Sequence, residues 1–371
     1  MKDHRVHINP QCHIVEGYSR NIIQDTFRGK YHIMPREFCN WICLINRKKL
    51  SDVCGRFGER STILYRDYLD FSIKNEIITT SSLAIPFQEI NLAFDIPQSI
   101  SNAIILENKQ LVESIYEVIN LGCENIQILL SEVWNWTKID FLLQLFYDSL
   151  VQHIELIVHH QDIFLNEDKW KSMFDKHKRL QHVFVFDSKR DDRIYADCFR
   201  YNSIVFVVDT FSFADCGFTH PLHFTNNLPF FTESQHHNTC LNRKICIDAN
   251  GNIKNCPAMA KSFGNIKDTT LEEAINKPGF KDLWYICKDQ IDVCKDCEFR
   301  YMCTDCRCFI KDPDNIYSQP AKCPYNPYIC LWEGQEGYVP VEECGAYSRE
   351  TGFVPDKKRI AELNKQIWGE E

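Results

Sequence analysis

Thiols are concentrated in the last third of this chain, where their number and spacing could support metal chemistry. Of 19 cysteines, seven precede residue 240, one follows residue 330, and the other eleven lie between Cys240 and Cys330. A disulfide framework of that density is typical of short secreted chains, whereas clustered thiols in a long chain more often bind metal. The sequence therefore predicts a metal-binding module in this segment.

The spacing divides these thiols into an early and a late group. The early group is Cys240-x5-Cys246-x9-Cys256, with Gly251 in a turn between two short expected strands. The late group is Cys294-x2-Cys297-x5-Cys303-x2-Cys306, followed by Cys308, Cys323 and Cys330. Zinc and cubane iron–sulfur clusters both take four thiolates, so ligand count does not separate them. Eight well-placed thiols suit two 4Fe–4S clusters, and zinc is the alternative.

Alternating strands and helices precede the thiols and must position them. Expected strands lie at 90–95, 103–106, 126–130, 154–158, 182–186 and 203–208. Expected helices run from a cap at Asn108 to Gly122, from a cap at Thr137 to Leu150, and around Trp170. Strands about thirty residues apart with helices between them predict right-handed βαβ units, and hence a parallel sheet or partial barrel of the α/β class.

The first 80 residues and the thiol-rich third have a different pattern. Near the N-terminus, 31–34 and 38–45 are expected to form hairpin strands, and helices are expected at 49–53 and 64–71. In the last third, Thr269 and Glu272 fit a capping box at the start of a helix. Elsewhere between the cysteines we expect loops, as is usual where metal replaces a hydrophobic core.

Composition excludes several classes of protein. The net charge of -9 disfavours nucleic acid as a partner, because phosphate binding needs a basic surface. No stretch approaches the roughly 18 apolar residues of a membrane-spanning helix. The first residues are not followed by the apolar run of a signal peptide. We therefore expect a cytoplasmic protein with neither a membrane nor a nucleic-acid partner.

The thiol pattern resembles the SPASM domain, the twin-cluster extension of radical SAM enzymes that modify peptides and proteins. The resemblance covers roughly residues 230–330 and rests on the two thiol groups with Gly251 and Cys323. It implies that the first cluster is held by Cys240, Cys246, Cys256 and Cys306. It implies that the second is held by Cys294, Cys297, Cys303 and Cys323. One residue fewer than usual separates Cys303 from Cys306, so Cys308 is an alternative crossing ligand, and Cys330 is an alternative to Cys323.

The thiols of a radical SAM cluster are missing from their usual place. Such catalysis needs Cys-x3-Cys-x2-Cys after the first barrel strand, yet no cysteine lies between Cys54 and Cys123. In Cys39-x3-Cys43 the third position is Asn46. Residues 130–132, Leu-Ser-Glu, replace the Gly-Gly-Glu turn that contacts S-adenosylmethionine in the family. The resemblance thus implies a degenerate radical-SAM-like barrel without a cofactor site and without radical SAM activity; an unrelated α/β domain is the alternative.

The whole chain is similar to the SPASM-domain peptide maturase of grasp-with-spasm systems, on the segments 263–266, 294–307 and 322–328. Those systems pair such a protein with an ATP-grasp ligase and a ribosomally made precursor peptide. The resemblance implies a winged-helix-like peptide-recognition element at 1–82, a partial (β/α) barrel at 83–225, and a loop-rich SPASM domain with a C-terminal tail at 226–371. Two other hypotheses stay open: an active redox or divergent radical SAM peptide-modifying enzyme, and a structural zinc-binding scaffold. The sequence assigns no catalytic residue.

Overall fold

The computed structural model describes residues 4–54, 59–197 and 202–369. The chain forms two compact units, each built from separate segments. The first unit contains 1–94, 217–239 and 286–371, and the second contains 95–216 and 240–285. Among the described residues, no helix has the length and apolar character needed to cross a membrane.

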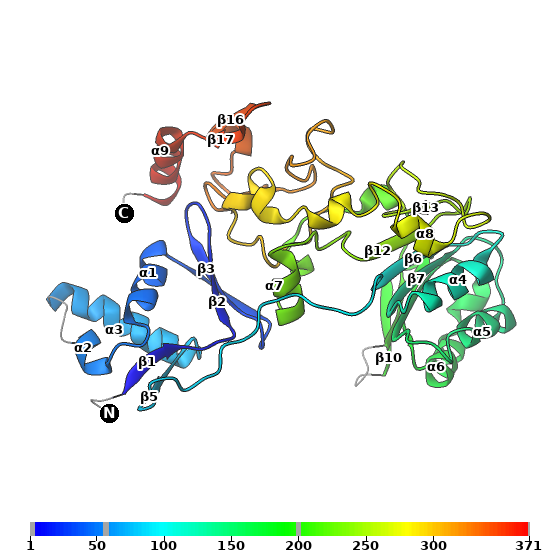
Figure 1. Ribbon diagram of the computed structural model, residues 1–371, viewed down its shortest axis with the longest axis horizontal. Coiled ribbons are helices and arrows are strands. Elements are labelled where there is room, and N and C mark those ends of the chain that lie inside the picture. The colour runs from blue at the N-terminus through cyan, green and yellow to red at the C-terminus, as the bar shows by residue number, and fades with distance from the viewer. Residues whose placement is uncertain (1–3, 55–58, 198–201, 370–371) are drawn as a thin grey trace. The chain divides into compact units, whose positions relative to one another are not determined.

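The second unit is built on a mostly parallel sheet (Figure 1), in the order β10-β11-β9-β8-β7-β6-β12-β13. Its strands are β6 (Asn102–Leu106), β7 (Asn125–Leu130), β8 (His153–His159), β9 (Leu180–Phe186), β10 (Asp192–Asp197), β11 (Asn202–Phe206), β12 (Lys244–Ile247) and β13 (Ile253–Lys254). The first and last neighbours in that order, β10 with β11 and β12 with β13, pair antiparallel, and the other pairs are parallel. The predicted mixed α/β fold with a parallel sheet is confirmed.

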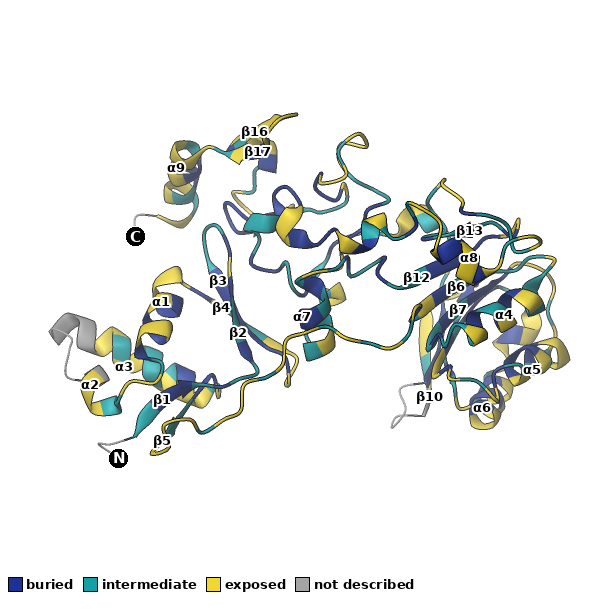
Figure 2. Ribbon diagram, viewed as in Figure 1, coloured by how far each residue is buried: buried dark blue, intermediate teal, exposed yellow. Residues whose placement is uncertain are grey.

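Three helices connect successive strands and cover one face of this sheet. They are α4 (Leu111–Asn120), α5 (Trp136–Gln144) and α6 (Glu167–Lys176). Strands β6 to β9 follow one another in space as in sequence, and right-handed crossovers then place every helix on the same face. Much of the sheet is buried (Figure 2), and its residues Ile105, Ile128 and Leu156 are fully buried. This one-sided order is that of a barrel wall, not of a doubly wound sheet.

Several boundaries differ from the predictions. Residues 90–95 form no strand and are largely exposed, because no neighbouring strand pairs with them, so β6 is the first strand of the sheet. Helix α4 begins after Gln110, whose backbone N–H donates to the Asn108 side chain. Helix α5 is capped by Asn135, not by Thr137, and ends before the predicted Leu150.

Two further differences concern elements of the second unit outside the parallel series. Strand β10 was not predicted, and it pairs antiparallel with β11 at the edge of the sheet. The capping box is made by Thr270 and Glu273, one residue later than predicted, at the start of α8 (Leu271–Ile275). The prediction was shifted by one residue because Thr269 and Thr270 are adjacent, so the sequence offers two threonines for the same cap.

The N-terminal part of the first unit combines two small sheets with three helices. Strands β2 (Cys12–Glu16), β3 (Asn21–Asp25) and β4 (Lys30–Met34) form an antiparallel sheet, and β1 (Arg5–Ile8) pairs with β5 (Ile78–Ser81). The helices are α1 (Arg36–Ile45), α2 (Leu50–Cys54) and α3 (Glu59–Lys74). The predicted strand at 38–45 is therefore wrong. Phe38, Trp41, Ile42 and Ile45 are all buried, and their spacing of three and four residues is that of a helix face.

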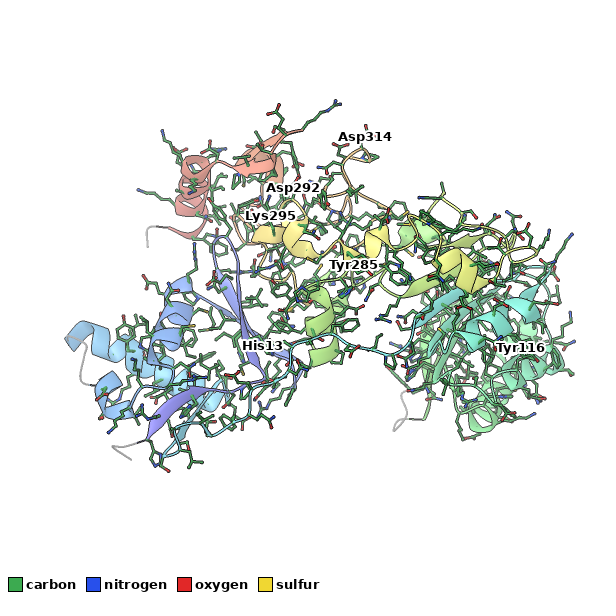
Figure 3. The ribbon with its side chains drawn as sticks, viewed as in Figure 1. His13, Tyr116, Tyr285, Asp292, Lys295 and Asp314 are labelled. Atoms are coloured by element: carbon green, nitrogen blue, oxygen red, sulfur yellow. The ribbon has the colours of Figure 1, made fainter. Side chains whose placement is uncertain are left out.

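The remainder of the first unit is rich in loops and short turns. Its regular elements are α7 (Leu228–Ser234), β14 (Tyr325–Asn326), β15 (Leu331–Trp332), β16 (Gly345–Ser348), β17 (Gly352–Pro355) and α9 (Lys357–Trp368). Helix α7 reaches the N-terminal sheet, which carries His13 (Figure 3). The ring of Phe231 stacks on that of His13, with 4.2 Å between the ring centroids. Tyr328 and Phe353 stack at 5.3 Å and anchor the C-terminal segment.

Candidate metal centre

Four cysteines of the late group border one cavity in the first unit. They are Cys294, Cys297, Cys303 and Cys323, which the resemblance to the SPASM domain assigned to the second cluster. The other lining is mostly apolar and aromatic, with Phe224, Phe299 and Trp332 among the residues that close the cavity. The structure thus brings together four thiols that lie up to 29 positions apart, from Cys294 to Cys323.

Short turns of the backbone place these thiols. In η6 (Cys294–Asp296) the N–H of Cys297 donates to the carbonyl oxygen of Cys294 at 3.0 Å, so the Cys-x2-Cys segment closes as one turn. Val293 precedes it with φ 66°, a left-handed conformation that is uncommon for a β-branched residue. The N–H of Cys323 donates to Pro320 at 3.3 Å in another turn. The thiols are therefore held by a folded backbone and not by flexible loops.

Burial raises the pKa of three of the four thiols. Removal from water raises the pKa of Cys294 to about 12, and it raises the pKa of Cys297 and of Cys323 above the usual range. A metal or cluster binds the thiolate, so loading must release these protons. Bonds between the metal and the thiolates must offset the free energy of removing these protons.

Among the described residues, two cations border the cavity: Lys288, which is buried, and Arg300, which is partly exposed. Nζ of Lys288 lies 3.2 Å from Sγ of Cys303 and 3.9 Å from Sγ of Cys294. Burial opposes its charge, but Cys294, Cys303 and Asp305 outweigh burial and hold the pKa of Lys288 well above its usual value. Sequence analysis missed this residue, because nothing in the run 284–291 distinguishes a buried lysine from an exposed one.

Cys306, which was assigned to the first cluster, and the alternatives Cys308 and Cys330 do not border this cavity. Cys330 is buried, with φ 58°, and its Sγ contacts the carbonyl oxygen of Pro327 at 3.7 Å. Cys306 packs against Gly217, where a Cβ would come within 2.8 Å of its Sγ. Because Gly217 has φ 82°, both its conformation and this close approach require glycine.

A buried ion pair fixes the backbone on both sides of Cys306. Nη2 of Arg307 donates to Oδ1 of Asp305 at 2.6 Å, and both side chains are almost completely buried. Nδ2 of Asn238 donates to the other carboxylate oxygen of Asp305, also at 2.6 Å. Arg307 further donates to the carbonyl oxygens of Ile316 and Ser318. The segment that carries Cys306 and Cys308 is thus tied to two other loops of the same unit.

The early group lies in the second unit. Cys246 is on β12 and completely buried, and Gly251, with φ 81°, turns the chain into β13, after which Cys256 follows. Nζ of Lys244 lies 3.5 Å from Sγ of Cys240. Burial opposes the charge of Lys244, while Cys240, Cys256 and Cys216 raise its pKa. Cys216 was not among the predicted ligands; Cys306 and Cys308 belong to the other unit.

The carboxyl edge of the parallel sheet carries polar groups of its own. The Glu107 carboxylate, just after β6, accepts from the backbone N–H groups of Ser131 and Glu132, each at 2.7 Å, and from Nε1 of Trp134 at 2.8 Å. These are the residues that follow β7. The backbone donors at this turn are therefore already occupied by a side chain of the same unit.

Comparison with protein families identifies the thiol-rich segment. Residues 239–298 match the SPASM family, an iron–sulfur cluster-binding domain. The SPASM match contains the early thiol group and the first two thiols of the late group, Cys294 and Cys297. The matched residues also include the β12–β13 hairpin, helix α8 and the turn that begins the second thiol set.

Comparison with curated proteins gives no match. Among solved structures, SuiB of Streptococcus suis bound to S-adenosylmethionine has 11% identity and a TM-score of 0.31, over 82% of this chain and 96% of that chain. SuiB bound to the precursor peptide SuiA has 9% identity and a TM-score of 0.32, over 85% and 98%. SuiB alone has 11% identity and a TM-score of 0.33, over 85% and 99%.

The chemistry of the second thiol set fits an iron–sulfur cluster. Four thiols around one cavity supply the four thiolate ligands of a cubane, and a buried cation stands beside them. Among residues 4–54, 59–197 and 202–369, no three His, Cys, Asp or Glu side chains are gathered closely enough to hold a single metal ion. Because its four thiols border one cavity, the second thiol set is the candidate site in the first unit.

Proposed function

We propose that this chain is an iron–sulfur protein of a ribosomal-peptide modification system, which binds a precursor peptide and acts with an ATP-grasp ligase. The observation that carries the proposal is the cavity bordered by four cysteines next to a segment that matches an iron–sulfur domain. Cys294, Cys297, Cys303 and Cys323 would hold the second cluster. Cys240, Cys246 and Cys256, with Cys306 or Cys308, would hold the first.

Metal analysis after anaerobic purification tests this assignment. Two cubane clusters correspond to about eight iron and about eight sulfide per chain. We expect both in this ratio, together with the broad visible absorbance of iron–sulfur proteins. Stoichiometric zinc without sulfide would establish the scaffold hypothesis in its place.

The same chain would lack a radical SAM cluster of its own. No cysteine lies between Cys54 and Cys123, so the loop after β6 has none. At the neighbouring turn, Glu107 already accepts from the backbone N–H groups of Ser131 and Glu132. Under dithionite reduction we expect no conversion of S-adenosylmethionine to 5′-deoxyadenosine and methionine, as measured by liquid chromatography. Cleavage would favour the divergent radical SAM enzyme.

The N-terminal element offers a strand edge for an extended peptide. In the sheet order β2-β3-β4, the outer side of β2 is engaged, because His13 stacks on Phe231 and the Glu16 carbonyl oxygen accepts from Arg300. At the start of β4 the carbonyl oxygen of Lys30 accepts from Nδ2 of Asn226 at 2.6 Å, while Ile33, near the other end of the strand, is 46% exposed. A peptide that adds a strand gains main-chain hydrogen bonds at such an edge, and apolar side chains beside it supply specificity. We therefore assign peptide binding to β4.

A substitution on β4 tests the docking edge. Ile33→Glu places a charge on this edge and should weaken the binding of a fluorescently labelled synthetic precursor peptide at least tenfold by anisotropy. Leu44→Glu, on the exposed side of α1, is the matched control and should leave affinity unchanged. Equal affinities of both variants and the parent would remove β4 from the proposal. Co-purification of the tagged chain with the ATP-grasp ligase, with and without peptide, tests the remaining partner.

A further inference from the structure

Lys288 occupies an unusual position for a lysine. Lys288 is only 4% exposed, and it borders the cavity that is lined by the four late cysteines. The turn η5 (Lys288–Gln290) fixes its backbone, because the N–H of Ile291 donates to its carbonyl oxygen and the N–H of Cys287 donates to Oε1 of Gln290. The side chain is therefore directed inward by a closed turn and does not reach solvent.

The ammonium group has sulfur atoms, not carboxylates, as its nearest partners. A buried cation without a counter-charge is strongly unfavourable. Within the described chain, no carboxylate forms an ion pair with Lys288, and the nearby Asp305 already binds Arg307 and Asn238 at 2.6 Å each. The contacts of Nζ are to Sγ of Cys303 at 3.2 Å and to Sγ of Cys294 at 3.9 Å. The counter-charge that this lysine needs would thus be supplied by the thiolates that form when a cluster binds.

We propose that Lys288 is a positioning residue for the second cluster, whose ammonium donates to the sulfur atoms of Cys303 and Cys294 and raises the reduction potential of that cluster. This inference rests on the proposed function, because it requires a cluster at the four thiols. A cubane with four thiolates is an anion, and one added electron makes it more negative. A fixed cation beside it in a poorly solvated site stabilises the reduced form more than the oxidised form.

The early thiol group contains a comparable lysine. Lys244 places Nζ 3.5 Å from Sγ of Cys240, in the other unit, and it is less buried than Lys288. The two lysines lie 44 positions apart in the sequence, at 244 and 288, and each contacts a different thiol group. Each should therefore shift the potential of one cluster and leave the other unchanged.

Redox titration of the reconstituted full-length chain, followed by electron paramagnetic resonance, tests the role of Lys288. Lys288→Met removes the charge while keeping most of the volume. It should reduce the equilibrium constant for one-electron reduction of one cluster at least tenfold, which corresponds to a potential about 59 mV lower. The second cluster should keep its potential. Lys288→Arg should restore most of the shift, because it returns a cation to the same place.

Two controls separate the charge of Lys288 from charge in general. Lys311→Met removes an exposed lysine that pairs with Glu342 at 2.7 Å and should leave both potentials unchanged. Lys244→Met should shift the other cluster only. An unchanged potential in Lys288→Met, with full iron and sulfide, would overturn the inference while leaving the proposed function intact.

Loss of the cluster is also informative. If Lys288→Met loses iron, then Lys288→Arg decides: restored iron and a potential close to that of the parent support the inference. Iron loss in both variants would contradict it, because the requirement would then be the shape of lysine and not its charge. A parent protein without iron and sulfide would instead refute the proposed function, on which the inference depends.

Discussion

At the scale of single residues, the structure distinguishes thiols of similar burial. Cys323 borders the cavity and Cys330 does not, although they are seven positions apart and both are largely enclosed. Removing one of four thiolates should release the cluster that it holds, whereas removing a thiol outside the site should not. The two cysteines therefore form a matched pair for mutation.

We expect Cys323→Ser to lower the iron content by about half, because one of two cubane clusters is lost. Cys330→Ser should retain the iron content of the parent. Iron and sulfide analysis of anaerobically reconstituted proteins measures both. The opposite ranking would transfer the ligand role to Cys330, and equal loss in both would indicate a general folding defect that a circular dichroism spectrum can detect.

At the scale of elements, the turn between β2 and β3 is fastened to the loop that carries Cys297. Nε of Arg20 donates to the buried carboxylate of Glu298 at 2.7 Å, and the hydroxyl of Tyr325 donates to the same oxygen at 2.5 Å. The N–H of Tyr18 donates to the carbonyl oxygen of Asp296 at 2.8 Å. Direct hydrogen bonds therefore join the N-terminal element to the loop of the second thiol set within one unit.

Arg20→Met should lower the free energy of unfolding of the first unit by about 3 kcal/mol, because it leaves a buried carboxylate without its cation. Arg359→Met, which breaks the exposed pair with Glu343, should cost at most about 1 kcal/mol. Urea denaturation followed by tryptophan fluorescence measures both. Adding Glu298→Gln to Arg20→Met should recover part of the loss, since no charge is then buried; a further loss would contradict this account.

The contact between α5 and α6 in the second unit predicts a pH dependence. Nε2 of His177 lies 2.7 Å from Oδ1 of Asp140, beside the ion pair of Asp140 with Lys176. Burial lowers the pKa of His177 below its usual 6.5, although Asp140 opposes this shift. The unfolded chain therefore takes up a proton at a higher pH than the folded chain does. Stability should fall as pH drops from about 6.5 towards the lower pKa of the folded state.

His177→Gln keeps a hydrogen-bond donor but does not titrate. Its free energy of unfolding, measured by urea denaturation from pH 7.5 to 5.5, should fall less steeply than that of the parent. His13, His32 and His182 also have a lowered pKa because of burial, so part of the slope should remain. An identical slope in parent and variant would show that His177 protonates equally easily in both states.

At the scale of the whole molecule, the early thiol group is part of the parallel sheet. Strand β12 pairs in parallel with β6, and its partner β13 lies at the sheet edge. Removing iron should therefore loosen this edge and not the centre of the sheet. By hydrogen exchange we expect roughly tenfold faster exchange at 244–254 in the metal-free protein, with β8 and β9 unchanged. Uniform acceleration over all strands would contradict a local effect.

Much of the sheet could be predicted from sequence, because each strand from β6 to β9 is an apolar run between turn-forming residues. The late thiols could be grouped with Cys323 only through the resemblance to the SPASM domain, because Cys-x2-Cys spacing alone pairs Cys303 with Cys306, which does not border the cavity. Helix α1 was missed, since aromatic and β-branched residues favour strands and only their burial shows the helical face. Lys288 and the Arg20–Glu298 pair could not be predicted, because they depend on segments that meet only in the folded chain.

The division of the chain into interleaved segments has a consequence for its synthesis on the ribosome. The second unit ends at residue 285, so its sheet and early thiols can be completed while the later residues are still being translated. The first unit begins with residue 1 but needs 286–371, and its N-terminal hairpin must wait for the loop that carries Glu298. In a nascent chain the second unit would therefore fold before the N-terminal element of the first unit. A chain truncated after residue 285 should yield a folded sheet with an unfinished N-terminal element, which limited proteolysis would detect.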